Sequence, residues 1–283
     1  MEMVMFIGLG IGIGVLSGFF GIGGGIILTP LLLIMGKSPS EAIALSLLLT
    51  LGSTVTGAFS HAKRKNVVWR DAAIIGGSGA LTSMVLAPLV VKMDNVEWAG
   101  MLTSLLYIVI LSVFAYRFLK KRTAANTTSD GQRAGFAKLS VIGIAAGVVS
   151  SLMGVSGGFV LTPLLTGWVR YDLKRAIGTG VAAAMLIVTL GLATHIGTGA
   201  GLPYMSGIFL IAGALLGTPF GTKRLLRFKD RTVDRLLGGF YVVVAVSVTL
   251  KLVHASTSAL FLLIGVALYL IGYISFRSPK PVA

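Results

Sequence analysis

The chain has 283 residues, of which 55% are hydrophobic and only 12% are charged, and its mean hydropathy is +0.93. Soluble domains carry about 25% charged residues, so the composition excludes an ordinary soluble protein and indicates a membrane protein. The net charge of +15 would suggest a nucleic-acid partner for a soluble protein. Here the basic residues lie in short loops between apolar segments, so no nucleic-acid partner is expected. The absence of cysteine excludes disulfides and thiol catalysis.

Long segments without any Asp, Glu, Lys or Arg run through the whole chain. They are residues 3–36, 42–60, 72–91, 98–116, 139–169, 176–222, 236–250 and 255–276. Most of them approach or exceed the roughly 20 apolar residues that cross a bilayer as a helix. We therefore expect two broken stretches, 3–36 and 139–169, and plain helices near 40–60, 71–91, 98–118, 174–197, 204–222, 233–252 and 256–276. The fold class is all-α integral membrane.

Helix starts carry capping signals at several of these boundaries. Ser38-Pro39-Ser40-Glu41 has the form of a capping box with proline at the first helical position. Asp172 takes the corresponding place in the second half of the chain, and Asp94 with Glu97 repeats the pattern.

The two halves of the chain repeat each other. Residues 14–32, GVLSGFFGIGGGIILTPLL, align with residues 147–165, GVVSSLMGVSGGFVLTPLL, and eleven of these nineteen positions are identical. Further on, at a spacing of 134 residues, His61 aligns with His195 and Tyr107 aligns with Tyr241. Two unrelated apolar helices would not keep register over this distance, so the chain is predicted to be duplicated.

Four regions follow from the duplication. They are a first membrane repeat (1–119), a cytoplasmic linker (120–137), a second membrane repeat (138–253), and a C-terminal transmembrane helix with a short tail (254–283). Each repeat is expected to hold a glycine-broken hairpin of two short half-helices and three transmembrane helices.

Loop charges predict the orientation of the repeats. If each hairpin enters and returns on one side, the second repeat is inverted, and 21 of the 24 Lys and Arg residues fall on a single side. Only Lys37, Lys92 and Lys251 fall on the other side. The positive-inside rule makes the first side cytoplasmic and places the C-terminus there. If each broken stretch instead crossed the membrane twice, the number of crossings per repeat would still be odd, and the second repeat would again be inverted.

Glycine clusters at 21–25 and 154–158 interrupt the two broken stretches. Non-helical backbone at membrane depth is tolerated only where it is buried in protein or lines a polar cavity. Free backbone N–H groups at the start of a returning helix favour an anion. Helix packing is the preferred interpretation of three other series with small-xxx-small spacing. They are Gly10/Gly14/Gly18, Gly79/Ser83/Ala87 and Gly213/Gly217/Gly221.

The paired G-x-G-G-G and G-x-S-G-G runs are each followed by Thr-Pro and then by the segments 42–46 (AIALS) and 176–180 (AIGTG). This pattern resembles the TauE/SafE sulfite exporter family of anion permeases over essentially the whole chain. The resemblance implies a multi-pass transporter of the prokaryotic plasma (inner) membrane that exports sulfite, organosulfonates or related anions with proton coupling. The family often has a Thr-Ser pair after the hairpin, whereas this chain keeps one hydroxyl per half, which leaves the substrate open.

Candidate substrate-binding residues are the backbone amides of the breaks and the hydroxyls near them. They are Ser17, Gly23, Gly24, Gly25, Thr29, Ser46, Ser150, Ser156, Gly157, Gly158, Thr162 and Thr179. His61 and His195 are candidates for proton coupling because histidine titrates near neutral pH. The alternative is that each anchors a helix end at the membrane interface, where Trp69, Trp98, Trp168 and Tyr171 are expected to form an aromatic belt.

No carboxylate falls inside the charge-free segments that are expected to lie within the membrane, so neither catalytic residues, nor a metal site, nor a cofactor is expected. This disfavours an enzyme or an assembly factor. A passive anion channel and an uptake carrier for another sulfur or carboxylate anion stay open. The expected partners are a small inorganic or organic anion and membrane lipid, and a homodimer is left open.

Overall fold

The computed structural model describes residues 2–93, 98–120, 134–198 and 204–276. These residues form helices and contain no strand. The helices are α1 (Glu2–Phe20), α2 (Gly25–Ile34), α3 (Pro39–Lys63), α4 (Trp69–Met93), α5 (Ala99–Leu119), α6 (Phe136–Met153), α7 (Gly158–Leu164) with a π-helix (Leu165–Val169), α8 (Leu173–Gly197), α9 (Tyr204–Leu225), α10 (Asp230–Leu252) and α11 (Ser256–Phe276). Within the described ranges, nine helices are long and apolar enough to cross a membrane. The all-helical membrane prediction is confirmed.

Two of the expected helix caps are present. The side chain of Ser38 accepts a hydrogen bond from the Glu41 amide at 3.3 Å, and Pro39 is the first residue of α3. Asp172 Oδ1 accepts one from the Arg175 amide at 3.0 Å at the start of α8. The third signal, Asp94 with Glu97, lies outside the described residues, as do most of the linker and the C-terminal tail.

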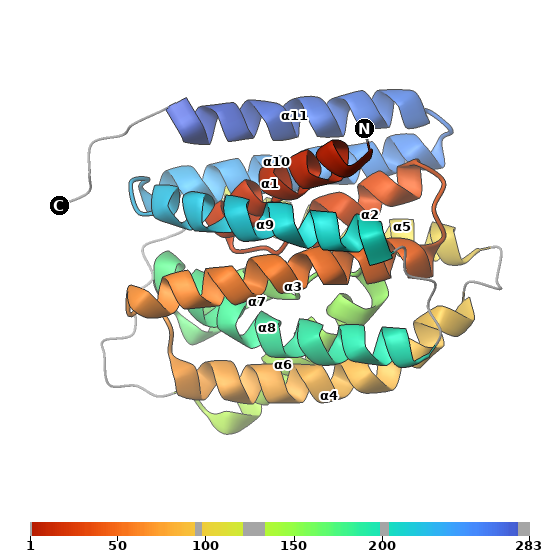
Figure 1. The fold of residues 1–283 in the computed structure, drawn as a ribbon. Helices are drawn as coiled ribbons and strands as arrows, with labels where there is room; N and C mark the ends of the chain where they lie inside the picture. The colour runs from red at the N-terminus through yellow and green to blue at the C-terminus, as the bar shows by residue number, and fades with distance from the viewer. Residues whose placement is uncertain (1, 94–97, 121–133, 199–203, 277–283) are drawn as a thin grey trace.

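Each glycine cluster separates a long helix from a short one. α1 and α6 have 19 and 18 residues, whereas α2 has 10 and α7 has 7. The expectation of two short half-helices is therefore wrong for the first arm of each hairpin. That arm continues as a helix until the first glycine with positive φ, which is +67° at both Gly21 and Gly154. In Figure 1, α2 leads back toward the end of the bundle where α1 begins.

The returning helices begin at the glycine clusters, not at the Thr-Pro pairs. Gly24 is the N-cap of α2 and Gly157 is the N-cap of α7. Pro30 and Pro163 consequently lie inside these helices. A proline inside a helix cannot donate to the carbonyl four residues earlier, so one carbonyl in each short helix is open to another donor.

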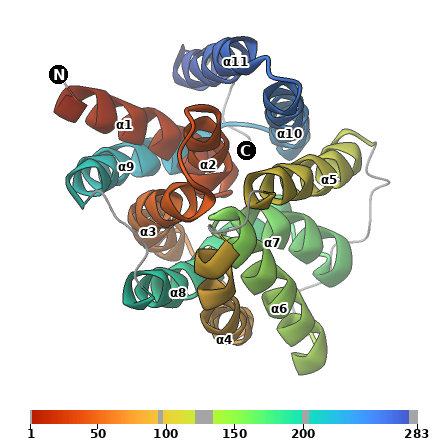
Figure 2. The same cartoon turned by 90° about the vertical axis from the view of Figure 1, so that its right-hand side faces the viewer.

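The two halves of the chain are interleaved. α1 packs on α9 as α6 packs on α4, and α3 packs on α9 as α8 packs on α4. α3 also meets α8, and α5 meets α10. Each of these contacts has a counterpart when every helix is exchanged for its partner in the other half. Figure 2 shows this arrangement end-on, with α2 and α7 near the centre and α11 at the edge.

The small-residue series are packing seams, as predicted. A Cβ added at Gly10, Gly14 or Gly18 would meet the backbone of α9 within 3.0 Å, and one added at Gly213 or Gly217 would meet the backbone of α1. The seam of α4 faces α6 in the same way, where Ser151 Oγ donates to Ser83 Oγ at 2.9 Å. Small residues allow this close approach of helix backbones in lipid.

Polar contacts tie the connections together at the end of the bundle that holds the α3–α4 and α9–α10 loops (Figure 1). Arg64 Nη1 donates to the Thr222 carbonyl at 2.8 Å. Tyr171 Oη donates to Asp71 Oδ2 at 2.6 Å, and Asp71 is only 2% exposed. The assignment of Tyr171 to the aromatic belt is therefore wrong, because it serves as the donor for a buried carboxylate. Trp69, Trp98 and Trp168 are exposed, as an aromatic belt requires.

Replacing Tyr171 by phenylalanine is expected to lower the free energy of unfolding by about 1–3 kcal/mol at neutral pH, because Asp71 loses its donor. Burial, together with the hydrogen bond to Asp71, raises the pKa of Tyr171 above its usual range. The folded protein then holds the phenolic proton more tightly than the unfolded chain. The contact therefore stabilises the fold below about pH 10 and is lost as pH rises further.

Melting temperatures in detergent between pH 7 and pH 11 check this prediction. Above pH 10 the wild type should lose stability faster than Tyr171→Phe. The control is Tyr116→Phe, because Tyr116 is 64% exposed. Identical pH slopes for the wild type and Tyr171→Phe would contradict the assignment.

Candidate functional site

The two glycine breaks touch each other inside the bundle. A Cβ added at Gly25 would collide with the carbonyl oxygen of Gly154, and one added at Gly158 would lie 2.6 Å from the carbonyl oxygen of Gly21. A Cβ at Gly23 would meet the side chain of Ser156. All residues of both breaks are buried. The duplicated motif is thus brought to one place, where the backbones are in direct contact.

Hydrogen bonds hold the breaks together and use some of the predicted donors. Ser156 Oγ donates to the Ile22 carbonyl at 3.1 Å and accepts from the Gly158 amide at 3.1 Å. The Gly25 amide donates to Thr50 Oγ1 at 3.0 Å. The amides of Gly25 and Gly158 are therefore already bonded within the protein. Among the described residues no acceptor is bonded to the amides of Gly23, Gly24 or Gly157.

Three buried hydroxyls beside the breaks have no hydrogen-bond partner among the described residues. They belong to Thr29, Ser46 and Ser150, all 0% exposed. Ser46 lies on the face of α3 where Ile43 contacts Gly154 and Thr50 binds Gly25. Ser150 is one turn before the second break, and its carbonyl accepts from the Gly154 amide at 2.9 Å. An unpaired buried hydroxyl costs about 1–3 kcal/mol, which a bound anion would offset.

The Thr29 hydroxyl lies against the second break, 2.9 Å from the position of a Cβ added at Gly154. The other predicted hydroxyls are placed differently. Thr162 Oγ1 donates to the Gly158 carbonyl of its own helix at 3.0 Å. Ser17 is buried, and its carbonyl accepts from the Gly21 amide at 2.7 Å. Thr179 Oγ1 accepts a hydrogen bond at 3.0 Å from the amide of Val68, which lies in the α3–α4 loop.

Two tyrosines at the breaks were not predicted as site residues. Tyr107 Oη donates to the Met153 carbonyl at 2.6 Å, and Tyr241 Oη donates to the Phe159 carbonyl at 3.4 Å. Pro163 has no N–H, so it cannot donate a hydrogen bond to the Phe159 carbonyl four residues earlier in α7. Both tyrosines are fully buried. The sequence did carry a signal for these two tyrosines. They occupy matching positions in charge-free spans, where a phenol needs a hydrogen-bond partner.

The two candidate histidines lie inside the bundle. His61 is 1% exposed and His195 is 0% exposed. Neither ring nitrogen of His61 has a hydrogen-bond partner among the described residues. This burial does not fit a histidine that anchors a helix end at the lipid interface. Within the described ranges no group of three or more His, Asp or Glu side chains could hold a metal ion.

In the part of the chain that the structure describes, nine helices are apolar and long enough to cross a membrane, and two broken hairpins meet in the interior. This architecture is typical of membrane transporters. The chain belongs to the TauE/SafE family, because the family described as "Sulfite exporter TauE/SafE" matches residues 6–248. Its members are membrane transporters, and the chain is therefore not an enzyme.

Curated relatives agree with this family assignment. A "Probable membrane transporter protein" of Xylella fastidiosa (strain 9a5c) is 28% identical over 256 residues, which cover 87% of this chain and 95% of the relative. The "Probable membrane transporter protein YjnA" of Bacillus subtilis (strain 168) is 24% identical, with coverage of 83% and 95%. A Haemophilus influenzae relative with the first description is 28% identical, with coverage of 84% and 94%. No solved structure matches the chain.

Proposed function

We propose that the protein is a secondary transporter that exports small oxyanions of the sulfite or organosulfonate type with proton coupling, and that the anion binds where the two breaks meet. The observation that carries this proposal is the buried contact between the breaks, flanked by hydroxyls without partners. Ser46 and Ser150 supply such hydroxyls, and Gly23, Gly24 and Gly157 supply amides. Donors without acceptors in a buried site favour a ligand that consists of acceptors.

The chemistry of the site supports a small anion over a cation. The groups at the breaks are amides and hydroxyls, and α2 directs its N-terminus at the first break. This end of a helix carries a partial positive charge. The buried carboxylate Asp71 lies in the first turn of α4, and the buried carboxylate Asp234 lies near the start of α10, not beside the breaks. A cation carrier would need such an acid at the site.

The proposal includes an inverted arrangement of the two repeats. The matched contacts between the halves support it, and so does the sequence, because an inverted arrangement would put 21 of the 24 basic residues on one side. That side is cytoplasmic by the positive-inside rule and includes the C-terminus. The proposed membrane is the prokaryotic plasma membrane, because relatives described as probable membrane transporters come from bacteria. Alternating access would then come from rocking of one repeat against the other.

Purified protein in liposomes tests the proposal. With an imposed pH gradient, a proton-coupled carrier accumulates radiolabelled sulfite, thiosulfate or a sulfonate above its equilibrium level. A passive channel only equilibrates the anion. If the protein transports a carboxylate in preference to all sulfur anions, its substrates belong to the alternative class, the carboxylates.

The variant Ser46→Ala is expected to raise the KM for the transported anion about tenfold, since one hydrogen bond to a charged group contributes about 1.5 kcal/mol or more. The thermal stability should stay unchanged or rise slightly, because the hydroxyl has no partner in the protein. Flux measured over a range of anion concentrations gives the KM.

Ser53→Ala is the matched control for this prediction. Ser53 lies two turns further along α3, is also buried, and donates to the Thr50 carbonyl of its own helix at 3.0 Å. Its KM should equal that of the wild type. Equal KM values for Ser46→Ala and Ser53→Ala would remove Ser46 from the site.

A further inference from the structure

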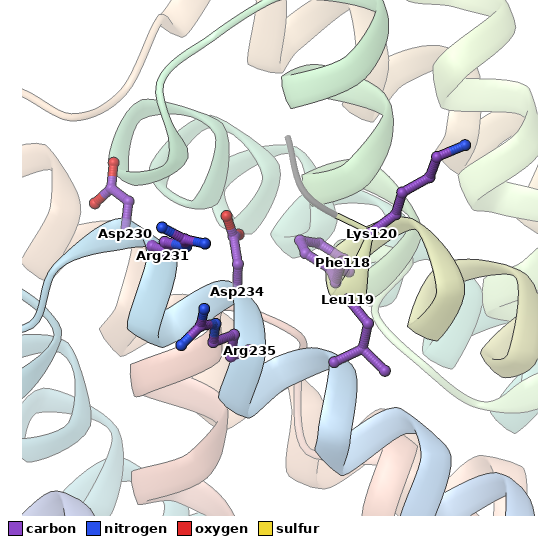
Figure 3. A pocket seen from close by; sticks show the side chains of 7 residues that line it. All are labelled: Phe118, Leu119, Lys120, Asp230, Arg231, Asp234 and Arg235. Atoms are coloured by element: carbon purple, nitrogen blue, oxygen red, sulfur yellow. The ribbon is translucent and has the colours of Figure 1, made fainter. Parts of the chain in front are cut away.

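A cavity of about 570 Å³ lies between the end of α5 and the first turns of α10. Its lining residues are Phe118, Leu119, Lys120, Asp230, Arg231, Asp234 and Arg235. Figure 3 shows Asp234 between Arg231 and Phe118, whereas Lys120 extends away at the rim. The lining includes three basic groups and two carboxylates, and Asp234 is only 7% exposed. The exposed rim is therefore predominantly basic.

A second cavity of about 100 Å³ shares Phe118 and reaches the second hairpin. It is lined by Arg117, Phe118, Pro163, Thr166 and Gly167. The guanidinium group of Arg117 lies over Gly167, where a Cβ would collide with it. A further basic group is thus placed between the large cavity and the short helix that returns from the break.

Aromatic rings connect the cavities to the second break. The ring of Phe118 meets that of Tyr241 at a centroid distance of 5.9 Å, and Tyr241 meets Phe159 at 6.2 Å. Phe159 follows Gly158, which contacts the first break. These three side chains are buried. They fill the space between a solvent-accessible basic cavity and the place where the breaks touch.

We infer that the large cavity is the vestibule through which the anion enters from the basic end, and that Phe118, Tyr241 and Phe159 form the gate that closes it in this structure. The inference rests on the proposed function, because it assigns the route to that same site. The rim attracts small oxyanions by its charge, and rotation of the rings would open the route between α5, α7 and α10.

Single cysteines test the route, because the chain has none of its own. Phe118→Cys and Leu119→Cys are treated with sulfonatoethyl methanethiosulfonate, a membrane-impermeant anion. The cysteine thiolate attacks the reagent's sulfenyl sulfur, which forms a mixed disulfide and releases methanesulfinate. In inside-out vesicles, where the basic end faces the reagent, modification should reduce the flux of a radiolabelled organosulfonate at least about fivefold. The same organosulfonate present during labelling should slow the modification, and it does not itself react with the reagent or with the mixed disulfide.

Tyr116→Cys is the matched control on the same helix. Tyr116 is 64% exposed and does not line either cavity, so its modification should leave the flux unchanged. Leu119→Cys keeps the test valid if Phe118→Cys fails to fold. Full labelling of either vestibule cysteine with unchanged flux would overturn the route. The unmodified protein serves as the reference, since absence of flux there would instead contradict the proposed function.

Charge substitutions test the basic rim separately. Arg231→Gln and Arg235→Gln should each raise the KM for sulfite about threefold at low salt without changing kcat, and the difference should shrink at high ionic strength. Lys229→Gln is the matched control, because Lys229 precedes the same helix and does not line the cavity. If neither Arg231→Gln nor Arg235→Gln changes the KM, the rim does not attract the anion and this part of the inference is contradicted.

Discussion

Replacing Gly25 by alanine is expected to abolish anion flux and to lower the free energy of unfolding by about 3 kcal/mol or more. The added methyl group would collide with the carbonyl oxygen of Gly154, which is backbone and cannot rotate away. The two hairpins would have to separate, and inserting one carbon into a packed interior typically costs about 1–3 kcal/mol even where side chains yield. The hydrogen bond from the Gly25 amide to Thr50 would be disturbed as well.

The matching glycine of the second repeat provides a graded comparison. A Cβ at Gly158 would lie 2.6 Å from the Gly21 carbonyl oxygen, which is less severe. Gly158→Ala should therefore lose less stability and retain some flux. Gly77→Ala is the control, because nothing lies within 4 Å of its added Cβ, and alanine favours the helix by about 1 kcal/mol.

Thermal unfolding in detergent and flux in liposomes are measured for all three glycine variants. The expected order of stability is Gly77→Ala, then Gly158→Ala, then Gly25→Ala. Wild-type stability and wild-type flux for Gly25→Ala would show that the breaks do not touch in the working protein.

Proton coupling is expected to fail when His61 or His195 is replaced by glutamine. Both imidazole rings are buried. A proton bound to either ring would create a buried charge, which is costly, so we expect the proton to be bound and released as part of the transport cycle. Each variant should lose accumulation driven by a pH gradient, by at least about tenfold. Exchange of labelled for unlabelled anion should continue, because the breaks are unaltered.

His254→Asn is the control for this pair. His254 lies between α10 and α11 with φ of +62°, a conformation that asparagine tolerates. Accumulation and exchange should both match the wild type. If His61→Gln and His195→Gln still accumulate anion in response to the pH gradient, the proton is carried elsewhere.

The burial of particular polar groups could not be predicted from sequence. Tyr171 and Asp71 lie 100 positions apart in the sequence. Taken alone, Tyr171 is typical of a loop and Asp71 is typical of a helix start, and neither indicates the other as its partner. Tyr241 is close to Phe159 because α10, which packs on α5, brings it to the second hairpin. Thr179 matched the family pattern in sequence, yet its hydroxyl accepts a hydrogen bond from the α3–α4 loop. Such contacts depend on which helices become neighbours.

The sequence by itself determined the helices, the duplication and the positions of the breaks. Local physical chemistry was sufficient for these features, because uncharged segments of about 20 residues form helices in lipid and clustered glycines interrupt them. It also predicted the seams of α1, α4 and α9, since small residues at every fourth position leave one helix face open to close approach.

Only the tertiary structure decided that the two breaks touch, which of their donors are already bonded, and where the basic cavity between α5 and α10 lies. Gly25 meets Gly154, and Ser156 bonds Ile22, through interleaving of the two halves of the chain. Which helices pack together depends on the fit of whole surfaces over many residues, and a single segment does not encode that fit. The site is therefore a property of two repeats together, although each repeat carries half of it in its own sequence.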